Sequence, residues 1–230
     1  MAQVQAWETE YKNSQLVTKS SEPQKDVLRF FKYLKKEEKV ELRGLNILDL
    51  GCGTGRNSNY LALLGNAVFG IDISKTAIDI AKKRANEAQL NNANYIVGDI
   101  GASYSFADNY FDLILDITSS NSLNEIEREN YIKETYRTLK KSGYLFVRAL
   151  CKDGDKNAKN LLKISPGKEY DTYFIKELNL TERVFTEKDF KEFYGKYFEI
   201  KKLLKKSGYA KFQNQSYKRN YWLAYLQKLT

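Results

Sequence analysis

Short apolar runs alternate along this chain with longer segments in which apolar residues recur at helical spacing. The positions of Val27, Phe31 and Leu34 predict a helix from residue 23 to about residue 36. Strands are predicted at residues 46–50, 67–72, 95–97, 111–117 and 144–150. Three helices are predicted between them: the first ends near residue 64, and the others span about 75–88 and 125–141. This alternation is typical of parallel strands joined by right-handed crossovers, with helices on both faces of the sheet.

Toward the C-terminus the alternation ends. Thr186, followed by Asp189 three residues later, predicts the start of a further helix. Strand-like runs at 197–204 and 221–226 then follow each other without a helical pattern between them, so we expect a terminal antiparallel hairpin. The residues between these runs, 205–220, are expected to form a long loop. The predicted fold class is therefore α/β, with a seven-stranded, mostly parallel sheet.

No repeat, low-complexity tract or linker divides the 230 residues, and a chain of this length can bury one substantial core. We therefore predict a single domain, 1–230. Within it we expect an N-terminal helical lid or cap (1–40), a core (41–150), an insertion on the substrate side (151–185), and a helix with the terminal hairpin (186–230).

The composition excludes several kinds of site. The chain contains no histidine, which excludes a Ser-His-Asp triad, a histidine-ligated metal and a histidine general base. Its two cysteines exclude a disulfide scaffold and a multi-cysteine zinc site, so we expect no metal. No apolar run resembles a signal peptide or a membrane span, which predicts a cytoplasmic protein with reduced cysteines and no membrane partner.

The positive charge is concentrated near the C-terminus. Residues 191–230 hold ten lysines and arginines against Glu192 and Glu199, a local charge of +8, whereas the formal net charge of the whole chain is +9. One interpretation is attraction to an anionic substrate or to a nucleic acid. The other is a solvated surface without a specific partner.

The sharpest local signal is the segment 47–58, an apolar strand followed by Gly51, Gly53 and Gly55 and then by a helix. Glycines at such a turn let a ligand approach the main chain, and the helix that follows presents free N–H groups. This pattern favours a nucleotide-like ligand, or else only a tight turn. Arg56 occupies the position where a dinucleotide-binding fingerprint needs a small residue, which disfavours a nicotinamide cofactor.

Two carboxylates follow at the ends of the next strands. Asp72 ends the second predicted strand, where it can accept hydrogen bonds from ribose hydroxyls or cap a helix together with Ser74. Asp99 ends the third predicted strand. Because the carboxyl ends of parallel strands share one edge of a sheet, we expect both residues beside the glycine turn.

With these features, residues 44–150 resemble the class I S-adenosylmethionine-dependent methyltransferases, whose fold is a Rossmann-like sheet with a C-terminal antiparallel hairpin. The segment 139–147 is similar to their approach to the fifth strand, although Ser142-Gly143 replaces the usual Pro-Gly or Gly-Gly. The resemblance implies S-adenosylmethionine as the cofactor and a methyltransferase activity. The residues that would surround this cofactor are Asp49, Gly51, Cys52, Gly53, Gly55, Asp72, Ile73, Asp99, Ile100, Asp116 and Tyr11.

The resemblance also implies individual roles. Asp49 and the glycines would surround the methionine part, with Asp116 near its amino group. Asp72 would bind the ribose and Asp99 the exocyclic amine of adenine, while the isoleucine that follows each would sandwich the adenine ring. More distantly, residues 55–58 and the spacing of Trp7 and Tyr11 are similar to small-molecule methyltransferases of the tellurite-resistance and thiol-methylating kind. Either aromatic could close over the cofactor, or only anchor the N-terminus to the core.

Methyl transfer is an in-line displacement, in which alignment in a dry pocket supplies most of the acceleration. A chain without histidine favours acceptors that are already nucleophilic, so we expect a small, anionic or soft-nucleophile acceptor and assign no catalytic residue. Asp116 or a tyrosine could still supply a base. We expect acceptor choice to lie in 151–185 and 205–220, where aromatic residues stand among lysines and arginines.

Two alternative functions remain. An RNA or tRNA methyltransferase would use the basic C-terminal region, although the segment after Asp116 lacks the proline run of base-amine methyltransferases. A non-catalytic binding module would use the same fold as a scaffold, which would not need the three glycines and two carboxylates. The oligomeric state is not predicted.

Overall fold

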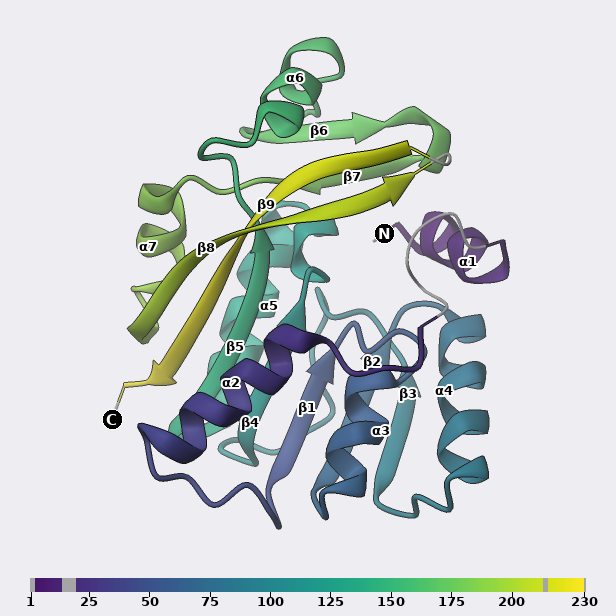
Figure 1. The fold of residues 1–230 in the computed structure, drawn as a ribbon, viewed down its shortest axis with the longest axis vertical. Helices are drawn as coiled ribbons and strands as arrows, with labels where there is room; N and C mark the ends of the chain where they lie inside the picture. The colour runs from purple at the N-terminus through teal and green to yellow at the C-terminus, as the bar shows by residue number, and fades with distance from the viewer. Residues whose placement is uncertain (1–2, 14–19, 213–214, 230) are drawn as a thin grey trace.

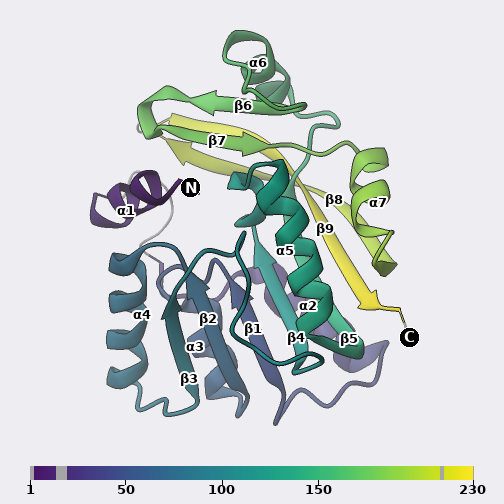
Figure 2. The same ribbon diagram turned by 180° about the vertical axis from the view of Figure 1, so that it is seen from behind.

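The computed structural model describes residues 3–13, 20–212 and 215–229, which form a seven-stranded sheet with helices on both faces (Figures 1 and 2). The sheet has the order β3-β2-β1-β4-β5-β9-β8. Its strands are β1 (Asn46–Leu50), β2 (Ala67–Asp72), β3 (Ala93–Val97), β4 (Phe111–Ile117), β5 (Leu139–Leu150), β8 (Phe198–Phe212) and β9 (Gln215–Lys228). Strands β1 to β5 are parallel, whereas β9 runs antiparallel to both β5 and β8, which confirms the predicted fold class.

Two layers of helices cover the sheet. On one face lie α2 (Lys25–Lys36), α3 (Arg56–Leu63) and α4 (Lys75–Glu87), and on the other lie α5 (Glu125–Thr138) and α7 (Glu187–Tyr194). The side chains of β1 alternate between these layers: Ile47 packs with α2 and α3, whereas Leu48 and Leu50 pack in the core beneath α5 and α7. Both faces of the strand are therefore buried, which explains its nearly continuous apolar sequence.

The insertion at 151–185 contains secondary structure of its own. It forms α6 (Lys156–Ile164) and a separate two-stranded antiparallel sheet of β6 (Thr172–Ile175) and β7 (Leu180–Arg183). Short 3₁₀ turns, η1 (Ser120–Ser122) and η2 (Lys176–Leu178), lie after β4 and between β6 and β7. Figure 1 shows α6, β6 and β7 beyond the carboxyl ends of the parallel strands, where they cover part of that edge.

The predicted long loop at 205–220 is wrong. Strands β8 and β9 continue through it as a two-stranded ribbon, with Lys205 opposite Trp222 and Tyr209 opposite Lys218, and residues 213–214 lie outside the described part of the chain. The ribbon extends past the parallel strands, so this part of β8 has no large buried apolar face and its sequence lacks the alternation that marks a core strand (Figure 1).

Two boundaries also differ from those predicted. Helix α5 ends at Thr138 rather than near residue 141, and β5 begins at Leu139 rather than 144, with a register shift against β4 before Tyr144. Among the described residues, none of the helices combines the length and the apolar character needed to cross a membrane.

Candidate active site

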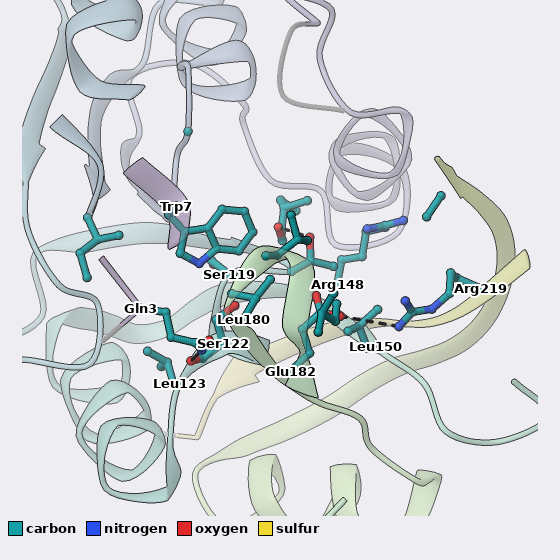
Figure 3. A pocket seen from close by; sticks show the side chains of 18 of the residues that line it. Gln3, Trp7, Ser119, Ser122, Leu123, Arg148, Leu150, Leu180, Glu182 and Arg219 are labelled. Atoms are coloured by element: carbon teal, nitrogen blue, oxygen red, sulfur yellow. Dashed lines mark hydrogen bonds and ion pairs between the residues drawn. The ribbon is translucent and has the colours of Figure 1, made fainter. Parts of the chain in front are cut away.

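A cavity of about 710 Å³ opens at the carboxyl edge of the parallel strands (Figure 3). Its walls come from the glycine turn, from the ends of β2 and β3, from the segment after β4, and from α1 (Val4–Lys12), the insertion and the terminal hairpin. The cavity thus joins the predicted ligand-binding turn to the two regions expected to select a substrate.

The glycine turn lies against other parts of the chain so closely that side chains would not fit. Gly51 has φ +66°, and a Cβ atom there would overlap the side chain of Ser119. Gly53 has φ +56°, and a Cβ atom there would lie 2.6 Å from the hydroxyl oxygen of Tyr11. At Gly55 the added atom would meet the hydroxyl oxygen of Tyr95 at 2.7 Å. Glycine is therefore required here for backbone conformation as well as for space.

Asp72 connects the end of β2 to this turn. Its Oδ2 accepts a hydrogen bond from Gly53 N at 2.9 Å, and its Oδ1 accepts one from Ser74 N at 2.9 Å. Burial raises the pKa of Asp72 to about 6. The cap of α4 is supplied by Ser74, whose Oγ accepts from Ala77 N, so the capping role that Asp72 could have shared belongs to Ser74.

Asp99 and the two isoleucines also line the cavity. Asp99 Oδ1 accepts a hydrogen bond from Gly101 N at 2.7 Å, which fixes the carboxylate at the end of β3. Ile73 and Ile100, each following one of the two carboxylates, contribute apolar surface to the same wall, as does Cys52 beside the turn. This end of the cavity therefore has both polar and apolar groups suited to a nucleoside.

Three of the predicted residues, Gly55, Asp49 and Asp116, are not among the residues that line the cavity, and the two carboxylates are buried. Asp49 accepts a hydrogen bond from Ser58 Oγ at 2.6 Å, and burial raises its pKa to about 7. Asp116 accepts from the backbone of Ser119 at 3.0 Å and from the hydroxyl of Tyr131 at 2.8 Å. Asp49 thus joins β1 to α3, and Asp116 stabilises the segment after β4.

Helix α1 covers part of the cavity and is held at two points. Glu8 accepts hydrogen bonds from Ser74 Oγ at 2.7 Å and from Thr76 Oγ1 at 2.6 Å, at the N-terminus of α4. At the other end, Gln3 Nε2 donates to the carbonyl oxygens of Ser122 at 2.7 Å and of Thr181 at 2.9 Å. Neither Gln3 nor Glu8 was singled out from the sequence, because each contact joins residues more than sixty positions apart.

Two aromatic residues of α1 line the cavity. The rings of Trp7 and Tyr11 lie 6.4 Å apart, and the hydroxyl of Tyr11 lies over Gly53. Burial and, to a smaller extent, the charge of Asp72 raise the pKa of Tyr11 well above its ordinary value. Tyr11 therefore remains protonated beside the turn.

The other end of the cavity is formed by the insertion, β5 and β9. Figure 3 shows Leu150, Glu182 and Arg219 there, with Arg148 nearby. Arg219 falls in the predicted loop 205–220 but lies in β9, where its side chain is only 9% exposed. Its guanidinium lies 3.6 Å from Asp155 Oδ2 and 3.9 Å from Glu182 Oε2. Sequence reasoning missed Arg148 and Glu182, although a lone arginine inside the apolar run of β5 is a detectable signal.

Several of the C-terminal cations have partners within the fold. Lys191 lies 2.6 Å from Glu187, Lys206 pairs with Asp26, and Lys201 lies near Glu199. In addition, Arg219 is buried in its polar network, and Lys228 Nζ donates to the carbonyl oxygens of Tyr136 and Leu139. Among the described side chains, at least five of the ten positive charges in 191–230 thus have internal partners. Among the described residues, no cluster of three or more cysteine or acidic side chains is placed to hold a metal ion.

Comparison with known proteins identifies methyltransferase relatives. A family model described as a methyltransferase domain matches residues 47–143, which include the glycine turn, Asp72 and Asp99. A ubiquinone biosynthesis O-methyltransferase of Coxiella burnetii is 35% identical over 135 residues, which make up 58% of this chain and 54% of that protein. The chain thus spans about half the length of this relative. It covers 70% of a methyltransferase of Schizosaccharomyces pombe, with 34% identity over 104 residues that make up 45% of this chain.

Solved structures are similar over more of the chain. The crystal structure of a SAM-dependent methyltransferase from Methanosarcina mazei matches with a TM-score of 0.72 and 28% identity, covering 84% of this chain and 95% of that one. TehB from Haemophilus influenzae matches with a TM-score of 0.64 and 22% identity, covering 87% of this chain and 62% of that one. The second likeness is one of fold alone.

Proposed function

Because the chain belongs to the class I S-adenosylmethionine-dependent methyltransferase family, we propose that it transfers a methyl group from S-adenosylmethionine to a small acceptor that is anionic or a soft nucleophile. The cofactor supplies a methyl group activated by its positively charged sulfur. The observation that carries the proposal is a single cavity that runs from the glycine turn to the insertion and the hairpin. Such a cavity can hold a nucleoside and a small acceptor side by side.

The residues present fit the cofactor. Gly51 and Gly53 line the cavity and have no side chains, so a ligand there can contact their main chain, and the Tyr11 hydroxyl lies over Gly53 as part of the wall. Asp72 keeps acceptor capacity beyond its two backbone hydrogen bonds and would bind the ribose. Asp99 would bind the adenine amine between Ile73 and Ile100.

The remaining predicted residues have complementary roles in the proposal. Gly51 and Cys52 would contact the methionine part, and Tyr11 would close over it. Asp49, Gly55 and Asp116 would act from beneath, by fixing the turn and the segment after β4. We therefore propose that, of the expected cap 1–40, α1 closes the cavity while α2 packs on the sheet, and that residues 151–185 act as the substrate-side insertion.

Catalysis in this proposal comes from alignment in a cavity with apolar walls. Trp7, Leu150 and Leu180 line the cavity and would exclude water from the reacting atoms. Holding two reactants in line can supply about 7–11 kcal/mol of the barrier reduction, which leaves no need for a dedicated acid or base. The proposal fails if neutral replacement of one ionisable side chain removes nearly all kcat while cofactor binding survives.

Two observations weigh against the alternatives. An RNA substrate would need the C-terminal charge as a free basic surface, but half of those cations have partners within the fold. A non-catalytic module would not need a glycine turn shaped by positive φ angles and by Asp72. Calorimetry with S-adenosylmethionine separates the module from an enzyme, since a module predicts no binding or binding that survives Asp72→Ala.

The decisive experiment incubates the protein and its Asp72→Ala variant with S-adenosylmethionine labelled in the methyl group, against pooled metabolites and against total RNA. We expect label in a small acidic metabolite with the native protein and much less with the variant. Label in RNA would replace the proposed acceptor class with the alternative. Cofactor binding without label in either pool would refute the proposed activity on small metabolites.

A further inference from the structure

Arg148 is a partly buried cation with unused hydrogen-bonding capacity. It lies near the carboxyl end of β5, and its side chain is 15% exposed. The guanidinium carbon lies 3.5 Å from the centroid of the Tyr221 ring, and Nε lies 3.5 Å from Asp26 Oδ2. Within the described part of the chain, this Nε makes no hydrogen bond. Arg148 is therefore a planar cation that the Tyr221 ring holds in place but whose hydrogen-bond donors are not all used.

The surroundings of Arg148 carry more positive than negative charge. Among the described residues, its ion-pair partner is Asp26, which is shared with Arg29 at 2.9 Å and with Lys206. Arg56 lines the same cavity, and its pKa is lowered first by burial and then by the positive charge of Arg148. Cations that converge on a cavity repel one another until an anion enters. The cavity wall is thus prepared for a negatively charged group.

The position of Arg148 in the sheet indicates which ligand carries that group. In the sheet order, β2 and β3, with Asp72 and Asp99 at their ends, lie on one side of β1, whereas β4 and β5 lie on the other. Arg148 stands opposite Ile117 of β4 and two residues before Leu150, both of which line the cavity. This half of the edge lies opposite the half proposed to bind the nucleoside.

We propose that Arg148, stacked on Tyr221, binds a carboxylate of the methyl acceptor. This inference rests on the proposed methyltransferase function and names the substrate class of the same site. A guanidinium matches the planar geometry of a carboxylate and can donate two parallel hydrogen bonds to it. A carboxylate held in this way loses nucleophilicity, so it anchors the acceptor while a second atom of the acceptor receives the methyl group.

Arg219, the other arginine at this end, does not offer the same site. It is buried against Asp155 and Glu182 and donates a hydrogen bond to the hydroxyl of Tyr173. Its Nε, like that of Arg148, makes no hydrogen bond to the described residues, but two neighbouring carboxylates balance its charge. In the part of the chain that the structure describes, Arg148 forms an ion pair with Asp26 alone, and two other cations share that carboxylate.

The test uses the full chain loaded with S-adenosylhomocysteine and pairs of aromatic probes that differ only in charge: benzoate and benzamide, salicylate and salicylamide, and 4-hydroxybenzoate and 4-hydroxybenzamide. Calorimetry gives the Kd of each. We expect at least one carboxylate to bind about tenfold or more tightly than its amide, and Arg148→Gln to remove this preference. Arg29→Gln is the matched control, because Arg29 shares Asp26 but is not among the cavity-lining residues.

The outcomes distinguish the inference from the function on which it rests. Failure of the native protein to bind S-adenosylhomocysteine would refute the methyltransferase proposal itself. Normal binding with no carboxylate preference in any pair, or a preference that survives Arg148→Gln, would overturn the role of Arg148. A variant that instead loses affinity for S-adenosylhomocysteine would assign Arg148 to the carboxylate of the cofactor. If Arg148→Gln does not fold, Arg148→Lys keeps the charge without the planar fork and should lose most of the preference.

Discussion

The contact between Gly53 and Tyr11 can be tested quantitatively with the substitution Gly53→Ala. Alanine at φ +56° costs about 1–2 kcal/mol of stability, because its Cβ approaches the backbone too closely. The new Cβ would also lie 2.6 Å from the Tyr11 hydroxyl oxygen, and forcing extra atoms into a packed site costs a further ~1–3 kcal/mol. We therefore expect Gly53→Ala to lower the free energy of unfolding by about 2–5 kcal/mol.

A second substitution separates the two terms. Tyr11→Phe removes the hydroxyl oxygen, and the nearest remaining ring atom, Cζ, would lie 3.5 Å from the new Cβ, an ordinary contact distance. The steric term should then disappear while the backbone term remains. We expect the double variant to lose about 1–3 kcal/mol less free energy of unfolding than the two single variants lose together.

Urea unfolding of the four proteins in this cycle measures the coupling. Gly44→Ala is the matched control, because Gly44 has φ +76° but no heavy atom of the described residues within 4 Å of an added Cβ, so it reports the backbone term alone. If the effects of the Gly53 and Tyr11 substitutions are additive to within about 0.5 kcal/mol, the Tyr11 hydroxyl does not lie over the turn. The described position of α1 over the cavity is then refuted.

Three further predictions concern the carboxylates and a helix cap. Burial raises the pKa of Asp49 to about 7, so the native protein should lose stability relative to Asp49→Asn as the pH rises from about 4 to 7; urea unfolding at several pH values checks this, and a relative gain would contradict it. The pKa of Glu8 is lowered to about 2, first by its hydrogen bond with Thr76, so this contact should be present above about pH 4.5 and be lost as the pH falls toward 2. In the native protein, loss of this contact should change the tryptophan fluorescence as the pH falls. Glu8→Gln should expose Trp7 already at neutral pH and abolish this change, whereas an unchanged acid transition in the variant would refute the role of Glu8 in holding α1. Thr186 Oγ1 accepts from Asp189 N at the start of α7, so Thr186→Ala should cost about 1 kcal/mol in thermal unfolding, whereas Thr186→Ser should be nearly neutral.

The sequence predicted the core well because local and tertiary signals agree there. Strands β1, β2 and β4 have the predicted bounds, since each is an apolar run that ends where the chain reaches the carboxyl edge. Gly51, Gly53 and Asp72 were identified for the same reason: their spacing is local, and the turn that they form is determined by backbone geometry.

The missed features depend on contacts that local sequence does not encode. The long ribbon of β8 and β9 is held by pairing between its own strands, and part of β8 has no buried apolar face to mark it. Gln3 and Glu8 bind partners far along the chain. In the sequence, Arg148 is an isolated charge in an apolar strand. Only the structure shows that it stacks on Tyr221 and lines the cavity.

The small sheet of β6 and β7 shares no strand with the main sheet, yet Leu180 and Glu182 on β7 line the cavity. The proposed nucleotide site and Arg148 belong to the main sheet, whereas β7 contributes a part of the cavity wall that belongs to a separate sheet. Mutations in that wall can change its shape and charge without disturbing the parallel strands beneath. Such an arrangement lets evolution retune selectivity within one scaffold while the shared reaction chemistry stays intact.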